Sequence, residues 1–135
     1  MNKTVWGVIA VVAAFLALQL FAAPEQPLAD EPFSGRVRYV VDGDSLYVEG
    51  VEPQIRLWGI NAPERDEPGH EQATKTLRKL VLQKPITCYR QGTDKFGRTV
   101  ARCETKAGKD ISQEMLDSGK ASEYCWFSKG FYGTC

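Results

Sequence analysis

Short runs in which apolar and polar residues alternate occupy residues 36–58, and these runs constrain the fold of the chain most. Alternation with a period of two is typical of strands that bury one face. The residues expected on one face of each run are Val37, Tyr39 and Val41, then Leu46 and Val48, then Ile55 and Leu57. Tight turns are expected at residues 42–44 and at Gly50 because Asp and Gly favour them. The pattern therefore predicts three short strands in a meander.

A helical period follows these strands. Residues 70–82 carry apolar side chains at helical spacing, and Pro85 would end the helix. Strand character returns at residues 86–90 and 98–104, and a second helix is expected from Asp110, with Gln113 as in a capping box, to Gly119. The residues expected on the buried helical faces are Ala73, Leu77, Leu80 and Val81, and Ile111 and Met115. This order predicts a mainly β fold with helices (α+β), a five-stranded OB-fold barrel with two to three helices.

The N-terminus differs from the rest of the chain. Residues 5–23 are apolar apart from Gly7 and Gln19, a length that suits a long signal peptide or a membrane anchor. Residues 24–34 are Pro-rich and acidic and are predicted to be a linker to a domain over residues 35–135. Because Lys3 lies before the apolar run and the acidic residues lie after it, we expect the domain to be exported, in the periplasm or outside the cell. Either cleavage after Ala22 or a retained tether in the inner membrane would agree with this pattern.

All four cysteines lie in the part of the chain that we expect to be exported. An even number of cysteines in a small exported domain favours two disulfides over free thiols. The cysteines are Cys88, Cys103, Cys125 and Cys135, so three pairings are formally open. We favour Cys88 with Cys103, which would face each other across a hairpin, and Cys125 with Cys135, which would tie down the tail. The single histidine, His70, leaves too few partners for a zinc site.

The charge balance excludes a strongly basic footprint for polyanions. Residues 32–135 hold 16 of the 17 Lys and Arg and 14 of the 17 Asp and Glu, which gives a net charge of +2. Contact with a nucleic acid would therefore need a local cluster of cations rather than a uniformly basic surface.

Three segments supply residues suited to metal and phosphate chemistry. These residues are Asp42 and Asp44 in a turn, Arg56, Asn61 and Glu64 in the following segment, and Asp94, Lys95 and Arg98 in the loop before the last strand. Carboxylate and amide oxygens in turns suit a hard cation, and arginines on separate segments suit a phosphate. Each feature alone has a structural explanation, since Asp-Gly turns are common and a strand arginine is often a surface residue. We base the functional interpretation on their combination.

The chain resembles the staphylococcal nuclease-like, or thermonuclease, domain family over residues 35–126. The resemblance is carried by five segments in the same order: VVDGDSLYV, IRLWGINAPE, EQATKTLRKLV, GTDKFGRTVARC and DISQEMLDSGKA. It implies an OB-type barrel and Ca²⁺-dependent hydrolysis of phosphodiesters in DNA and RNA by a nuclease, and nothing indicates more than a monomer.

The resemblance also implies roles for individual residues. Asp44, the Asn61 amide and the Ala62 backbone carbonyl would bind Ca²⁺, with Asp42 as a nearby acidic support. Arg56 and Arg98 would hold the phosphate as negative charge builds on it, and Glu64 would activate the attacking water. Lys95, Phe96 and Tyr124 would lie along the bound strand.

Three positions depart from the family pattern. Asn61 stands where the family has a ligand aspartate, which removes one formal charge and weakens expected Ca²⁺ binding by roughly 1–3 kcal/mol. Phe96 replaces a tyrosine and keeps a stacking face without the hydroxyl, while Ser45 replaces a threonine. An alternative function is therefore a catalytically weakened or inactive module that binds nucleic acid, and a third is an anchored envelope domain that binds a protein partner.

The C-terminal tail is rich in aromatic residues, which are Tyr124, Trp126, Phe127, Phe131 and Tyr132. They would either stack on bases at the mouth of the barrel or cover its open end. We favour covering for most of them, because large aromatic side chains are mostly buried.

Overall fold

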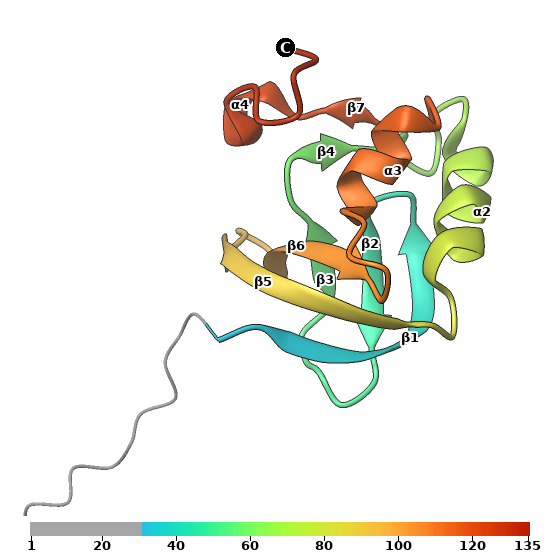
Figure 1. The fold of residues 1–135 in the computed structure, drawn as a ribbon. Helices are drawn as coiled ribbons and strands as arrows, with labels where there is room; N and C mark the ends of the chain where they lie inside the picture. The colour runs from blue at the N-terminus through green and yellow to red at the C-terminus, as the bar shows by residue number, and fades with distance from the viewer. Residues whose placement is uncertain (1–30) are drawn as a thin grey trace, which may run out of the picture.

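The computed structural model describes residues 31–135. Ten elements follow one another within these residues. Figure 1 shows the strands curving around one another, with helices at one side and at one end. The strands are β1 (Phe33–Asp42), β2 (Ser45–Val48), β3 (Ile55–Leu57), β4 (Ile60–Asn61), β5 (Pro85–Thr93), β6 (Thr99–Thr105) and β7 (Ser122–Glu123). The helices are α2 (His70–Val81), α3 (Ile111–Asp117) and α4 (Cys125–Ser128). The expected signal or anchor at residues 5–23 lies outside the described residues.

Five strands close into a barrel in the order β1-β2-β3-β6-β5, which confirms the predicted five-stranded barrel. Neighbouring strands are antiparallel except β3 and β6, which run parallel and pair Arg56 with Val100. The barrel closes where Phe33–Arg36 of β1 pairs with Pro85–Cys88 of β5. Strand β1 begins at Phe33, two residues before the predicted start of the domain at residue 35.

The predicted alternation in β1 is wrong after Val37. Val37 and Val40 are both buried, whereas Tyr39 is 52% exposed and Val41 is only partly buried. The cause is irregular pairing with β2, because the register shifts between Val37 and Tyr39 and again between Val40 and Asp42. Such a bulge turns the following side chains to the other face. In β3 the alternation holds, since Ile55 and Leu57 are fully buried.

Helices α2 and α3 contribute the expected residues to the core. Ala73, Leu77 and Val81 of α2 are fully buried, as are Ile111 and Met115 of α3, while Leu80 is partly buried against the core. At the start of α3 the Asp110 carboxylate accepts a hydrogen bond from the backbone N–H of Gln113, as in a capping box. The return bond of the box, from the Asp110 backbone N–H to the Gln113 side-chain oxygen, is not formed; the Gln113 side-chain amide nitrogen donates to Asp117.

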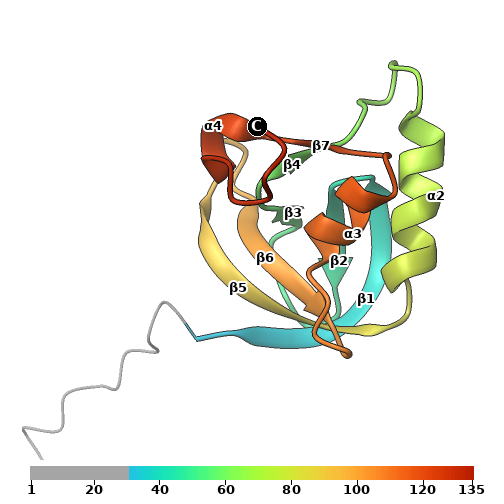
Figure 2. The same cartoon turned by 45° about the horizontal axis from the view of Figure 1, so that its top comes forward.

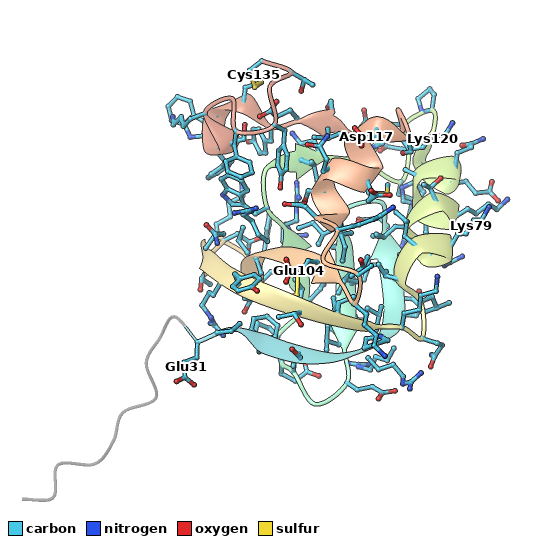
Figure 3. The ribbon with its side chains drawn as sticks, viewed as in Figure 1. Glu31, Lys79, Glu104, Asp117, Lys120 and Cys135 are labelled. Atoms are coloured by element: carbon cyan, nitrogen blue, oxygen red, sulfur yellow. A yellow bond between two sulfur atoms is a disulfide. The ribbon has the colours of Figure 1, made fainter. Side chains whose placement is uncertain are left out.

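Two disulfides join the four cysteines, as Cys88–Cys103 and Cys125–Cys135. The first links paired residues of β5 and β6 inside the core. The second closes the C-terminal tail, which lies over one end of the barrel (Figure 2). Figure 3 shows Glu31, the first described residue, and Cys135 at opposite ends of the molecule. Within the described residues, no helix has the length and apolar character needed to cross a membrane.

Candidate active site

The turn between β1 and β2 carries two carboxylates held in fixed positions. The Asp42 Oδ1 atom accepts hydrogen bonds from the backbone N–H of Asp44 at 3.1 Å and from the Ser45 hydroxyl at 2.7 Å. The hydroxyl of Ser45, which replaces the family's threonine, is thus engaged in the turn. These bonds fix Asp42 beside Asp44, which is 5% exposed.

Gly43 lets this turn approach the rest of the protein closely. A Cβ atom at position 43 would lie 2.6 Å from the Cβ of Ala62 and 2.7 Å from the Cβ of Ala73. Real Cβ atoms do not approach that closely, so only glycine fits without a shift of α2 or of the Ala62 segment. The site therefore depends on α2 for its shape, although α2 contributes none of the predicted site residues.

Asp44 and Arg56 form the centre of the site. Asp44 Oδ2 accepts a hydrogen bond from the Ala62 backbone N–H at 2.8 Å and lies 3.3 Å from Arg56 Nη2. The same Nη2 donates to Asn61 Oδ1 at 2.8 Å, and Nη1 donates to the Leu57 carbonyl at 2.6 Å. Burial raises the pKa of Asp44 to about 7; the Arg56 guanidinium opposes this rise and the Asp42 carboxylate adds to it. A cation beside Asp44 would favour its charged form.

The oxygen atoms around this turn fit a hard cation. Asp42 Oδ2 and Asp44 Oδ1 accept no hydrogen bond from the described residues, so each carboxylate has one oxygen available. No group of three or more His, Cys, Asp or Glu side chains among residues 31–135 could hold a metal ion, so other ligands must come from amide, backbone and water oxygens. Ca²⁺ accepts such mixed oxygen ligands. Asn61 Oδ1 already accepts one bond from Arg56, which leaves it a second lone pair.

The loop between β5 and β6 presents Arg98. Asp94 organises this loop, because its Oδ1 accepts the backbone N–H groups of Phe96 at 2.9 Å and of Arg98 at 3.0 Å. Asp94 Oδ2 accepts a hydrogen bond from Arg98 Nε at 2.6 Å. Burial alone would raise the pKa of Asp94, but the bonds from Arg98 and Phe96 outweigh it and lower that pKa. The Nη atoms of Arg98 form no hydrogen bond with the described residues and remain able to bind an anion.

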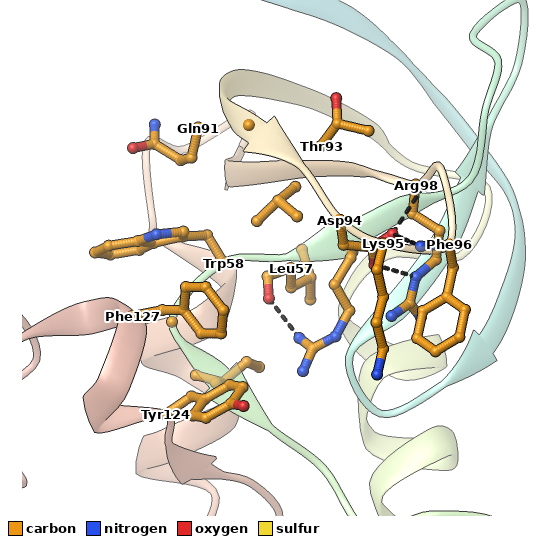
Figure 4. Close-up of a pocket in the computed structure, with 15 residues that line it drawn as sticks. Leu57, Trp58, Gln91, Thr93, Asp94, Lys95, Phe96, Arg98, Tyr124 and Phe127 are labelled. Atoms are coloured by element: carbon orange, nitrogen blue, oxygen red, sulfur yellow. Dashed lines mark hydrogen bonds and ion pairs between the residues drawn. The ribbon is translucent and has the colours of Figure 1, made fainter.

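A pocket of about 620 Å³ brings the two arginines together. Its lining comes from β3 and the segment after it, from the end of β5 and its loop, and from the C-terminal tail. Figure 4 shows Asp94, Lys95, Phe96 and Arg98 on one side of the pocket and Tyr124 and Phe127 on the other. The lining residues are Arg56–Ile60, Gln91–Phe96, Arg98, Val100, Tyr124 and Phe127. The predicted substrate-binding residues Lys95, Phe96 and Tyr124 thus meet at one pocket with Arg56 and Arg98.

Glu64 lies close to this cluster in the sequence, two residues after Ala62. Its backbone follows Pro63 in a turn, where its N–H donates to Glu67 Oε1 at 3.0 Å. The Glu64 side chain is exposed, and no hydrogen bond or ion pair between described residues involves its carboxylate. Glu64 is also absent from the pocket lining. The structure therefore leaves the carboxylate accessible to water, near the site along the chain.

The sequence assigned no role at the site to Asp94 or Trp58, and it left open whether Phe127 stacks on bases or covers the barrel. Asp94 was named as part of the loop, but its ion pair with Arg98 was not predicted. The spacing of four residues within one loop is the sequence clue to that pair. Trp58 and Phe127 line the pocket although neither was among the predicted site residues. They come from segments more than sixty residues apart, so local pattern carries no clue to their meeting.

The barrel and the two-arginine pocket define an OB-type protein with a site suited to a phosphate. The family model described as "Staphylococcal nuclease homologue" matches residues 54–132, which is more than half of the chain. The chain belongs to this family.

The chain is similar in sequence to proteins of several bacteria. The chain is 31% identical over 117 residues to the "Succinoglycan biosynthesis protein ExoI" of Rhizobium meliloti, covering 78% of this chain and 60% of the relative. It is 30% identical over 100 residues to an "Uncharacterized endonuclease" of Escherichia coli O157:H7, with coverage of 73% and 65%. An "Uncharacterized endonuclease" of Haemophilus influenzae is 34% identical over 96 residues, with coverage of 69% and 53%. The chain thus spans between half and two thirds of the length of these relatives.

Proposed function

We propose that this protein is a Ca²⁺-dependent nuclease that hydrolyses phosphodiester bonds in DNA or RNA. The observation that carries the proposal is the meeting of Arg56 and Arg98 in one pocket beside an oxygen-rich turn. The family membership and the relatives named endonucleases support it.

Arg56 and Arg98 bind the phosphate in this proposal. Protein groups hold each guanidinium in place. Arg56 donates a hydrogen bond to the Leu57 carbonyl and forms an ion pair with Asp44, and Arg98 forms an ion pair with Asp94. Anchored donors need no reorganisation when negative charge builds on the phosphoryl oxygens, so they stabilise the transition state more than the ground state.

Asp42, Asp44, Asn61 and the Ala62 carbonyl hold the metal. When bound, Ca²⁺ polarises a phosphoryl oxygen and helps to orient the nucleophile. The side chains of the set carry two negative charges, and the aspartate expected from the family at position 61 would give three. We therefore expect half-maximal activity at a raised Ca²⁺ concentration, because the charge of the ligands tunes the affinity.

Glu64 accepts a proton from the attacking water. Its carboxylate has no partner among the described residues, and its turn is rigid because Pro63 precedes it and Glu67 accepts its N–H. Lys95, Phe96 and Tyr124 lie along the bound strand: Lys95 contacts a phosphate, and the rings of Phe96 and Tyr124 stack on bases.

The test is cleavage of single- and double-stranded DNA and RNA by the full-length protein, kept in mild detergent because of its apolar N-terminus, across a Ca²⁺ series. Cleavage should rise with Ca²⁺ and be lost in Glu64→Gln, while the exposed Glu49→Gln, a matched control, should cleave like the wild type. Equal cleavage by Glu64→Gln and the wild type would refute the role of Glu64. No cleavage by a folded wild type at any Ca²⁺ concentration would refute the nuclease.

The second candidate is a module that binds nucleic acid without turnover. The contact of Asn61 with Arg56 favours it, because the amide accepts a hydrogen bond where the family has a charged metal ligand. This candidate predicts binding that weakens steeply with salt and no cleavage at any Ca²⁺ concentration. A lack of affinity for single strands at low salt would exclude it.

We further propose that the domain is exported as a monomer, with residues 5–23 as a cleaved signal or a tether in the inner membrane. The two disulfides support an oxidising compartment, since such bonds are rare in reducing ones. N-terminal sequencing of the protein recovered from cell fractions distinguishes cleavage from a tether. Recovery of reduced, full-length protein from the cytoplasm would contradict export.

A further inference from the structure

Residues 123–135 form a C-terminal cap that is stabilised by bonds among its own residues. The carboxylate of Glu123 lies at its centre and accepts four hydrogen bonds, which lower its pKa to about 2 although burial would raise it. The donors, at 2.6–2.9 Å, are the Ser128 hydroxyl, the Tyr132 backbone N–H, and the Thr134 backbone N–H and hydroxyl. The Cys125–Cys135 disulfide closes the same segment. The cap is therefore a fixed structure rather than a loose tail.

One side of the cap packs on the barrel. Tyr132 contacts Trp58 at 6.0 Å between ring centres, and its hydroxyl donates to Asp110. Phe131 lies 5.5 Å from Trp58 and 4.4 Å from the guanidinium carbon of Arg102. The sequence favoured a covering role for most of the tail aromatics. That role holds for Tyr132, but it is wrong for the majority, because Tyr124, Trp126, Phe127 and Phe131 are exposed.

The other side of the cap exposes large aromatic side chains. Trp126 is 72% exposed and Phe127 is 54% exposed, so burial does not explain them. The Lys129 ammonium lies 4.6 Å from the Trp126 ring and gives this surface a positive charge. Exposed aromatic side chains on a rigid segment mark a binding surface, because folding gains little from holding them in water.

This surface continues the pocket. Phe127 and Tyr124, with ring centres 4.8 Å apart, form one wall of the pocket that contains Arg56 and Arg98. Trp126, the residue before Phe127 in α4, is not part of the pocket lining and places a second exposed ring outside the pocket. The surface formed by Trp126, Phe127 and Lys129 thus shares Phe127 with the pocket and carries a ring and a cation outside it.

We propose that the outer surface of the cap, formed by Trp126, Phe127 and Lys129, binds a single-stranded segment of the substrate beyond the pocket. Trp126 and Phe127 stack on bases, and Lys129 contacts a phosphate. The strand must be single because a paired base offers no free face to a side chain. This inference rests on the proposed function and adds to it a second binding region, which only substrates longer than the pocket can reach.

The experiment measures the affinity of the full-length protein for labelled oligothymidylates by fluorescence anisotropy. The Glu64→Gln background with Ca²⁺ prevents turnover. Trp126→Ala should weaken binding of a strand of about twelve nucleotides roughly tenfold and leave binding of a dinucleotide unchanged. Trp126→Phe should restore most of the affinity because it keeps a stacking face. Lys129→Gln should weaken binding of the longer strand and make that binding less dependent on salt.

Matched variants control for general effects. Tyr39→Ala removes another exposed aromatic side chain, on the barrel wall, and Lys106→Gln removes another exposed cation; neither should change the affinity for either strand. Thermal unfolding should be unchanged by Trp126→Ala, because the Trp126 side chain is 72% exposed and contributes little to the core.

Several outcomes would overturn the inference. These are equal affinity of Trp126→Ala and its background for the longer strand, an equal loss for both lengths, and duplex binding as tight as single-strand binding. Loss of binding to phosphatidylglycerol vesicles in Trp126→Ala, with strand affinities unchanged, would assign the surface to a membrane instead. Length-dependent binding without any wild-type cleavage would support this inference while the nuclease proposal failed, so the two are separable.

Discussion

Replacing Asp94 with Asn tests whether a carboxylate behind Arg98 determines the strength of the phosphate site. Asp94 accepts backbone N–H groups through Oδ1 and the Arg98 side chain through Oδ2. Asn keeps the first oxygen, so the loop should retain its shape. The Asn side chain also places its amide N–H₂ opposite Arg98 Nε. Because both groups are donors, the hydrogen bond that holds the Arg98 guanidinium is lost.

The geometry of the pair sets the magnitude. Two unit charges about 4 Å apart attract by about 4 kcal/mol at an effective dielectric constant of 20, whereas exposed ion pairs measure about 0.2–1 kcal/mol. The side chains of Arg98 and Asp94 are 25% and 19% exposed, which places the pair between these limits. We therefore expect Asp94→Asn to cost about 1–2 kcal/mol of transition-state stabilisation, because the Arg98 guanidinium is no longer held in place. This cost corresponds to a fall in kcat/KM of roughly 5- to 30-fold.

The assay is a double-mutant cycle in cleavage of a short fluorogenic oligonucleotide at saturating Ca²⁺. The cycle contains Asp94→Asn, Arg98→Ala and the double variant. Arg98→Ala should lower kcat/KM by about 10²–10³-fold, as loss of one donor to a developing negative charge does. The double variant should match Arg98→Ala, because Asp94 acts through Arg98. Asp66→Asn, at an exposed position, is the matched control.

Two results would refute the reasoning. If Asp94→Asn keeps the wild-type kcat/KM, the bond between the Asp94 carboxylate and Arg98 does not contribute to catalysis. If the two single losses multiply in the double variant, Asp94 acts independently of Arg98. Thermal unfolding of each variant separates either result from a loss of folded protein.

Three further predictions concern the metal, the cap and pH. Asn61→Asp should tighten Ca²⁺ binding by about ten- to hundredfold in isothermal titration, since it adds a charge to the site; unchanged affinity would show that residue 61 is not a ligand. Cys125→Ser with Cys135→Ser opens a loop with a sequence separation of 10 and should lower the free energy of unfolding by about 3 kcal/mol, measured by denaturant titration; a loss below the error of the titration would contradict this entropic account. In the folded protein the pKa of Glu123 lies at about 2, below its ordinary value of 4.5. The Glu123 carboxylate therefore stabilises the fold fully above pH 4.5, and this contribution is lost as the pH falls toward 2. Glu123→Gln should flatten this part of the profile of unfolding temperature against pH, and an unchanged slope would contradict the role of Glu123.

Much of the barrel was predictable because its strands and helices show local periods. The burial of Ile55 and Leu57 and the inward face of α2 follow from spacing alone. The prediction for β1 fails at Tyr39 because the bulge depends on pairing with β2, and a bulge leaves no mark in a period of two. Strands β4 and β7 have two residues each, too few to show any period.

The site was predictable in parts. The resemblance pointed to Asp44, Arg56 and Arg98, and the structure places them around one turn and one pocket. The wall formed by Phe127 was not predicted, because it depends on how Glu123 and the second disulfide hold the tail against β4. Such contacts between distant segments are properties of the closed fold.

The parallel pairing of β3 with β6 has a consequence for the protein before it folds. Arg56 and Arg98 lie more than forty residues apart and become neighbours only when these two strands meet. A growing or unfolded chain therefore has neither the pocket nor a pair of arginines that could bind one phosphate. If the domain is exported as proposed and crosses the membrane before it folds, it passes the cell's own nucleic acids without the pocket that would bind their phosphates. Under the proposed function, the ability to cut would arise only where the barrel closes.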